Sequence, residues 1–224
     1  MHVTQVRHIL ISDDVYKRLR DAIFSGELGS GERLDIRRLA DEFGVSNQPV
    51  KEALNRLALE GLVSIKPRSG TFVRTLTLAD IHHILDARLM IETFAVSAIS
   101  DPDPALLAAL GAKAAELKRS AHEQPFQLGH YNETDIDFHE TLVQMSENPE
   151  LLRLYRSLHS HFVTARVYFV TALEKTLANE DDHQHIYQAL VHRDIAQARN
   201  IVKRHISDAK EGIVHLVQSG EIQL

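Results

Sequence analysis

The sequence contains no cysteine, which excludes disulfide bonds and thiolate metal sites and removes any need for an oxidising compartment. No run of apolar residues approaches the roughly 18 that a membrane-spanning helix needs. The N-terminal stretch MHVTQVRHILISDD is too short and too interrupted by His and Arg for a secretory signal. Internal repeats and low-complexity segments are also lacking. We therefore expect a cytoplasmic protein without membrane association.

The composition predicts a folded chain whose charge is divided between two parts. With 224 residues, 44% of them hydrophobic, the chain has room for one large or two modest domains. The formal net charge is -6. Residues 1–76 hold 12 Lys and Arg against 10 Asp and Glu, whereas residues 77–224 hold 13 against 21, so the first part is at +2 and the second at -8. A basic surface within residues 33–74 can attract phosphates although the whole chain is acidic.

The segment LADEFGVSNQPVKEALNRLALEG, residues 39–61, predicts two short helices joined by a tight turn. Gly44 is expected to end the first helix and Ser46 to cap the second. The inner face of the second helix is apolar and consists of Val50, Leu54 and Leu57. Its outer face is polar and consists of Asn47, Gln48, Lys51 and Asn55. Because short amides and a cation near a helix start can bond base edges and phosphates, this layout is typical of a helix-turn-helix DNA reader.

Short elements are expected on both sides of this motif. An apolar stripe of Val15, Leu19 and Ile23 predicts a helix from about Asp13 to Ser25, after which Arg33 and Leu34 lead into the helix-turn-helix. After Gly61, the segments LVSI and TFV predict two strands around the turn KPRSG, which together form a wing. The tip of the wing carries Lys66, Arg68 and Gly70. A flexible basic loop of this kind suits a DNA backbone or minor groove.

In these segments the chain resembles the winged-helix DNA-binding domain of the GntR family of bacterial transcription regulators. The resemblance rests on GELGSGERL, LADEFGVSNQPVKEALNRLALEGL and SIKPRSGTFV, and it covers about residues 10–75. It implies that Arg37, the first residues of the recognition helix and the wing contact DNA. The alternative for Arg37 is a solvated helix charge, and the alternative for Asn47 is a residue that only supports the helix start. Family members often carry Arg where this chain has Asn47 and Lys51, so their operator sequences do not transfer.

The rest of the chain has a helical pattern. No glycine occurs between Leu76 and Gly111. Helices are expected at about residues 78–100, 105–122, 130–146, 150–177, 181–191 and 194–217, separated by Pro-, Asn- and Asp-containing breaks. The predicted fold is mainly α, with a winged helix-turn-helix domain at residues 1–76 and an antiparallel bundle of six or seven helices at residues 77–224.

One group of polar residues in the expected bundle suits a metal ion. Asp135 and His139 are four residues apart, which places a carboxylate and an imidazole on one helix face. His183 and His205 lie on the last two expected helices, which an antiparallel arrangement can bring into register. Three imidazoles and one carboxylate suit a divalent transition metal with open coordination positions. With 14 His in the chain, such spacings also arise by chance, and the alternative is four ordinary polar residues.

The segments DIDFHETLVQMSENPELL, HQHIYQAL and ARNIVKRHI resemble the metal-binding, all-helical effector domain (FCD domain) of FadR-type members of the GntR family. The resemblance implies a ligand set of Asp135, His139, His183 and His205. It also implies a divalent transition metal as cofactor, for which we expect zinc, with nickel or manganese as alternatives. The other nearby histidines, namely His185, His192 and His215, fall outside the pattern and are expected at the surface or behind the ligands.

The same resemblance implies a binding site for a small carboxylate effector. Arg88, in the segment DARLMIE, occupies a position where the family often directs an Arg into the cavity, and a guanidinium can grip a carboxylate through two parallel bonds. Arg166, in HFVTARVYFV, is a second candidate. The alternatives are a surface ion pair for Arg88 and a buried aliphatic stem for Arg166.

Together these patterns predict a ligand-responsive bacterial transcription regulator that is not an enzyme. We expect a homodimeric repressor that binds double-stranded operator DNA and is released by a small organic acid held at the metal site. One alternative is a metal-dependent enzyme in which the same four residues activate water. Another is a DNA-binding protein whose metal is purely structural. A fatty acyl-CoA sensor is less favoured, because the metal set implies a polar cavity.

Overall fold

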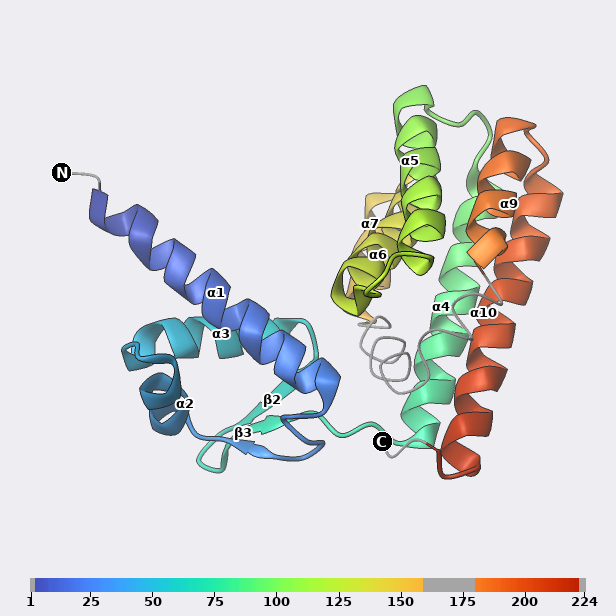
Figure 1. Ribbon diagram of the computed structural model, residues 1–224. Helices are drawn as coiled ribbons and strands as arrows, with labels where there is room; N and C mark the ends of the chain where they lie inside the picture. The colour runs from blue at the N-terminus through green and yellow to red at the C-terminus, as the bar shows by residue number, and fades with distance from the viewer. Residues whose placement is uncertain (1–2, 159–179, 222–224) are drawn as a thin grey trace. The chain divides into compact units, whose positions relative to one another are not determined.

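The computed structural model describes residues 3–158 and 180–221, which divide into two compact units with a boundary between Leu76 and Thr77 (Figure 1). The first unit combines three helices with a small sheet, and the second is built from helices alone. Helices dominate the described residues, which confirms the predicted mainly α fold class. No helix within these ranges is long and apolar enough to cross a membrane.

The first unit is a winged helix. Its elements are α1 (Val3–Ser25), β1 (Arg33–Leu34), α2 (Ile36–Phe43), α3 (Asn47–Leu59), β2 (Val63–Lys66) and β3 (Gly70–Val73). The three strands form an antiparallel sheet in the order β1-β3-β2. The sequence predicted β2 and β3, but it missed β1, because a strand of two residues is too short to show an alternating pattern.

Helix α1 begins ten residues before the predicted start at Asp13. Acidic residues favour the first turn of a helix, but here both acidic residues lie within the helix and form ion pairs. Asp14 pairs with Arg18 at 3.0 Å, and Asp13 pairs with Arg56 of α3 at 3.2 Å. The predicted stripe is correct, and its three residues, Val15, Leu19 and Ile23, are each at most 2% exposed.

The two helices of the helix-turn-helix have different starts. Asp35 caps α2, where one carboxylate oxygen accepts hydrogen bonds from the backbone N–H groups of Arg37 and Arg38. Gly44 ends α2 in the left-handed conformation, as expected. Ser46 occupies the cap position of α3, but its side chain forms no capping bond. Pro49, the third residue of α3, has no N–H, so only the N–H of Gln48 remains as a possible partner for this cap.

The second unit is a helical bundle made, within the described residues, of six helices. They are α4 (Leu78–Ala98), α5 (Pro104–Ala121), α6 (Leu128–Gln144), α7 (Pro149–Ser157), α9 (Glu180–Val191) and α10 (Ile195–Gln218). The predicted bounds agree to within about two residues for all of these except α7, whose expected continuation to Leu177 lies outside the described residues. Asp194 caps α10 by accepting from the backbone N–H of Gln197, as expected.

An apolar core joins five of these helices. Helix α10 packs against α4 and α9, and α5 packs against α6 and α9 (Figure 1). Helix α4 contributes Val96, and deeply buried contributors from α5, α6, α9 and α10 include Leu110, Ala114, Phe138, Leu142, Ile186, Leu190, Val202 and Ile206. Because α6, α9 and α10 each present an inward face to this core, polar residues on those faces are brought together away from water.

Candidate functional site

Three histidines from three helices converge in the bundle. His139 of α6, His183 of α9 and His205 of α10 are 0%, 2% and 6% exposed, and each offers one ring nitrogen within 4.8 Å of the other two. Asp135 lies one turn before His139, with its Oδ1 3.1 Å from His183 Nε2 and 3.6 Å from His139 Nε2. The four predicted ligand residues therefore lie together in the fold.

The spacing of these donor atoms fits a metal ion. Nε2 of His139 and Nε2 of His183 are 3.4 Å apart. Two nitrogens that each bind one zinc ion at about 2.0–2.1 Å in tetrahedral geometry lie about 3.3–3.4 Å apart. Since Asp135 faces both of them, a cation between the three side chains would satisfy all three donors. An imidazole and carboxylate set of this kind suits zinc and other divalent transition metals.

A buried ion pair stands behind His139 and orients its ring. Glu92 of α4, which is fully buried, has one oxygen 2.7 Å from His139 Nδ1 and accepts a 2.6 Å bond from Arg88 Nε through the other. A carboxylate bound to one imidazole nitrogen fixes the tautomer that leaves the other nitrogen free to bind a metal. The order Arg88, Glu92, His139 therefore presents Nε2 toward Asp135 and His183.

The electrostatics of the cluster keep its carboxylates ionised. Burial by itself would raise the pKa of Asp135, but His139 and His183 outweigh it and hold that pKa well below its usual range. Burial would likewise raise the pKa of Glu92, yet His139 and Arg88 lower it to about 2. For His183, burial and the neighbouring His205 lower the pKa to about 4. His183 is therefore neutral near pH 7, which is the state in which an imidazole binds a metal.

Glu92 was missed by the sequence analysis, although a signal for it exists. Arg88 and Glu92 are four residues apart in DARLMIE, which is the spacing of a helical ion pair. Nothing in the sequence shows that this pair is buried or that it faces His139, because those facts depend on how α4 packs against α6.

The two predicted effector residues have different outcomes. Arg88 is 3% exposed and is therefore no surface ion pair. Within the described residues its Nη2 has no hydrogen-bond partner, although Nε is bound to Glu92. Burial would lower the pKa of Arg88, but Tyr155, Glu92 and Asp135 outweigh it and raise that pKa, so the guanidinium stays charged beside the cluster. Arg166 lies outside the described residues.

The predicted DNA-contacting residues lie at the surface of the first unit. Arg37, Asn47, Gln48, Lys51, Lys66 and Arg68 are exposed, and Gly70 is half-buried at the start of β3. Arg38, next to Arg37, pairs with Glu32 and Glu42, whereas Arg37 forms no ion pair within the described part of the chain. Gln48 donates a 2.9 Å bond to Glu52 one turn later, which restricts its amide. The wing turn has positive φ at Arg68 (63°) and Gly70 (124°).

Comparison with known families matches both units. The profile described as "Bacterial regulatory proteins, gntR family" matches residues 11–73, and that of the FCD domain matches residues 83–208, which is more than half of the chain. The chain belongs to the GntR family. Its first unit is therefore a DNA-binding domain of a transcription regulator, and its second is an FCD domain, a metal-binding domain that here supplies three buried histidines.

Individual relatives agree with this assignment. The HTH-type transcriptional regulator YdhC of Bacillus subtilis is 27% identical over 209 residues, which are 92% of each chain. The gluconate operon transcriptional repressor of B. subtilis is 29% identical over 88% of this chain and 83% of its own. A GntR regulator from Rhodococcus sp. RHA1, known as a crystal structure, is 26% identical with a TM-score of 0.69 and covers 91% of this chain and 97% of its own. These relatives are regulators, so the metal-enzyme alternative is set aside.

If the cluster binds zinc, zinc should stabilise the protein, and this stabilisation should depend on His183. At a free zinc concentration of 100 times Kd, the wild-type protein should gain about 2.7 kcal/mol in free energy of unfolding. The variant His183→Ala should gain little at the same concentration, because it lacks a buried donor. His185→Ala is the matched control, since His185 is exposed on the same helix. Thermal denaturation with and without zinc measures the gain, and equal stabilisation of all three proteins would contradict the ligand assignment.

Proposed function

We propose that this GntR-family protein is a homodimeric repressor that leaves its operator when a small carboxylate binds in the FCD domain. The observation that carries this proposal is the buried cluster of Asp135, His139, His183 and His205 with the guanidinium of Arg88 beside it. With a divalent metal ion bound, the charges of the ion and of Arg88 would exceed those of Asp135 and Glu92, which suits a small anion because a buried charge is stable only when it is paired.

Different residues of the cluster would bind the metal ion and the carboxylate. Asp135 and the three histidines would hold a divalent metal ion, for which we propose zinc. Such an ion supplies open coordination positions for a carboxylate oxygen when it is bound. Arg88 would hold the same carboxylate by a charge-assisted hydrogen bond from Nη2, the donor that Glu92 leaves unused. Tyr155, fully buried near Glu92, stays a neutral phenol because burial and Glu92 raise its pKa.

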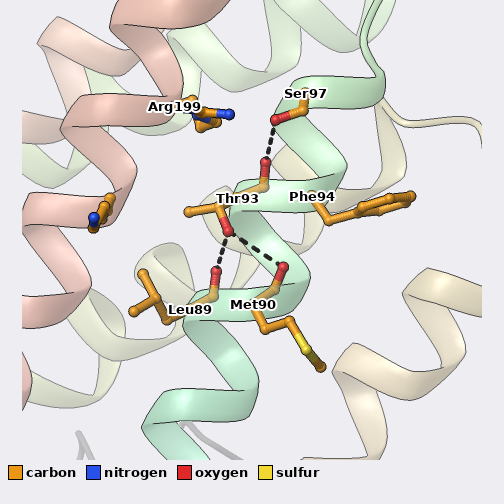
Figure 2. Close-up of a pocket in the computed structure, with 7 residues that line it drawn as sticks. Leu89, Met90, Thr93, Phe94, Ser97 and Arg199 are labelled. Carbon is orange, nitrogen blue, oxygen red and sulfur yellow. Dashed lines mark hydrogen bonds between the residues drawn. The ribbon is translucent and has the colours of Figure 1, made fainter.

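Exposed apolar side chains on α4 support the proposed dimer. Met90 and Phe94, one turn apart, are 66% and 59% exposed. They belong to the lining of an open groove of about 490 Å³ that also includes Arg199 and Lys203 of α10. Figure 2 shows that Met90 and Phe94 extend from α4 away from Arg199. Large apolar side chains grouped on one surface mark an interaction site more often than isolated ones do. We propose that a second copy of the chain covers this α4 surface.

In a dimer, release from DNA can follow from a change in the distance between the two recognition helices. Two recognition helices of a dimer reach half-sites about one turn of DNA apart, roughly 34–36 Å, only in a suitable arrangement of the two copies. The dimer would exist in a DNA-binding arrangement and in a second arrangement that does not fit both half-sites. A carboxylate shifts this equilibrium only by the difference between its binding free energies for the two arrangements. Because Arg88 and Glu92 lie on α4, the proposed site can bias the helix that carries the proposed dimer surface.

The dimer proposal is tested by the double substitution Met90→Ser with Phe94→Ser. We expect the wild-type protein to sediment as a dimer and the variant to dissociate at concentrations at least about tenfold higher, because a buried Met or Phe contributes on the order of 1.5–3 kcal/mol. Leu59→Ser is the control, since Leu59 is 78% exposed on α3. An unchanged dimer in analytical ultracentrifugation would place the interface elsewhere.

The DNA surface predicts two distinct losses. Gln48→Ala should change base preference at one or two operator positions, where a well-formed contact contributes about 1–3 kcal/mol of discrimination. Lys51→Ala should weaken binding to all sequences similarly and reduce the slope of log affinity against log salt by about 1. Selection from random DNA followed by fluorescence anisotropy on the selected duplex measures both. An identical consensus for Gln48→Ala would remove its role in base reading.

The effector role of Arg88 is tested with Arg88→Lys. Lysine keeps the charge that Glu92 needs but lacks the separate Nη2 donor, fixed in the guanidinium plane, that Arg88 would direct at the effector while its Nε stays bound to Glu92. In a panel of mono-, di- and tricarboxylic acids, the acid that releases wild-type protein from the selected duplex should be needed at roughly tenfold or higher concentration for the variant. Binding of DNA without acid should be unchanged. Arg153→Lys, an exposed pair of Glu150 on α7, is the control, and equal release of both variants would refute the role.

A further inference from the structure

Asp182 joins a surface arginine to one of the buried histidines. It lies at the start of α9 and is 8% exposed. One of its oxygens, Oδ1, is 2.5 Å from Nη2 of Arg204, and the other, Oδ2, is 3.5 Å from Nδ1 of His205. Both partners are neighbours on α10. A single carboxylate thus pairs with an arginine at the surface and faces a buried histidine of the cluster.

This arrangement repeats the one behind His139. There Arg88 bonds to one oxygen of Glu92, and the other oxygen faces Nδ1 of the imidazole. Both histidines therefore direct Nδ1 toward a carboxylate that an arginine holds. The outcome of such pairing is one tautomer, with the proton on Nδ1 and Nε2 left to bind a metal. The Asp182 contact is an ion-pair distance rather than a hydrogen bond, and within the described residues Nδ1 of His205, like Nδ1 of His183, has no hydrogen-bond partner.

The two arrangements differ in their access to water. Arg88 and Glu92 are almost fully buried, whereas the side chain of Arg204 is 55% exposed and borders a cleft between α9 and α10. The contact between Asp182 and His205 is also longer than an ordinary hydrogen bond of about 2.7–3.2 Å. The contact of Asp182 with His205 is therefore weaker than the contact of Glu92 with His139, and the arginine that pairs with Asp182 is at the surface.

We propose that Asp182 is a positioning residue that orients His205 for metal binding and that Arg204 holds Asp182 in place. The inference rests on the proposed metal site. Under it, Asp182 sets the tautomer and ring angle of His205 without touching the metal. Arg204 fixes which way the carboxylate points, so a substitution at the surface of α10 changes metal affinity inside the bundle.

The test measures Co²⁺ binding by the full-length protein, because Co²⁺ replaces zinc in such sites and its visible absorption reports ligand geometry. Asp182→Asn should weaken Co²⁺ and Zn²⁺ affinity by about 10–100-fold and change the visible spectrum of the cobalt form. Arg204→Ala should weaken affinity in the same direction by a smaller factor, and Arg204→Lys should restore part of it. Arg204 is half exposed, so these variants remain informative if Asp182→Asn does not fold.

Two exposed residues supply matched controls. Asp181→Asn removes an exposed carboxylate that pairs with Lys118, and Arg153→Ala removes an exposed arginine of α7 that pairs with Glu150, so both should bind Co²⁺ as the wild type does. If Asp182 merely stabilised the fold, Asp182→Asn would lower the melting temperature with unchanged metal affinity and spectrum, which would overturn the proposal. If the wild type bound neither Co²⁺ nor Zn²⁺, the proposed metal site would be wrong, and the role of Asp182 would be wrong as well.

Discussion

The pairing of polar groups inside an apolar core is the constraint on which the helical domain depends. Asp135 and the three histidines lie where α6, α9 and α10 meet, and a buried charge without a partner is costly. The ion pair of Arg88 and Glu92 extends the network to α4. Removing one member of a buried pair costs about 3–5 kcal/mol, against a total stability of about 5–15 kcal/mol. Well-packed apolar residues would be at least as stable, so stability alone does not call for this network, in keeping with the binding role proposed above.

Under the proposed function, helix α4 would combine three roles through its periodicity. Arg88 and Glu92 are one turn apart and buried in the bundle, whereas Met90 and Phe94, offset by two residues, are exposed. Figure 2 shows the last two extending from α4. An offset of two residues rotates a side chain by about 200° around a helix, so the two pairs lie on opposite faces. The same helix begins directly after the boundary at Leu76 and Thr77, which makes it the covalent continuation of the DNA-binding domain. Binding at one face can thus influence the other.

In the DNA-binding domain, contacts at the far end of the recognition helix hold it against α1. The hydroxyl of Tyr16 donates to the carboxylate of Glu60 at 2.8 Å, and the guanidinium of Arg56 lies 3.7 Å from the centre of the tyrosine ring. Burial and Glu60 raise the pKa of Tyr16 to about 12, so the phenol keeps its proton at neutral pH. This anchoring leaves the first turn of α3, with Asn47, Gln48 and Lys51, exposed for DNA.

The mainly α fold, the winged helix-turn-helix and most helix ends in the bundle could be predicted from the sequence, because they depend on local periodicity and on turn residues such as Gly44 and Asp194. The family and the four residues of the candidate metal site were predicted by resemblance. What those four residues face depends on how the helices pack. Glu92 and Asp182 look like ordinary helix acids in the sequence, and they become partners of histidines because α4 and α9 pack with those faces inward. The same packing buries His183 and exposes His185, two residues away, since helical rotation places them on opposite sides.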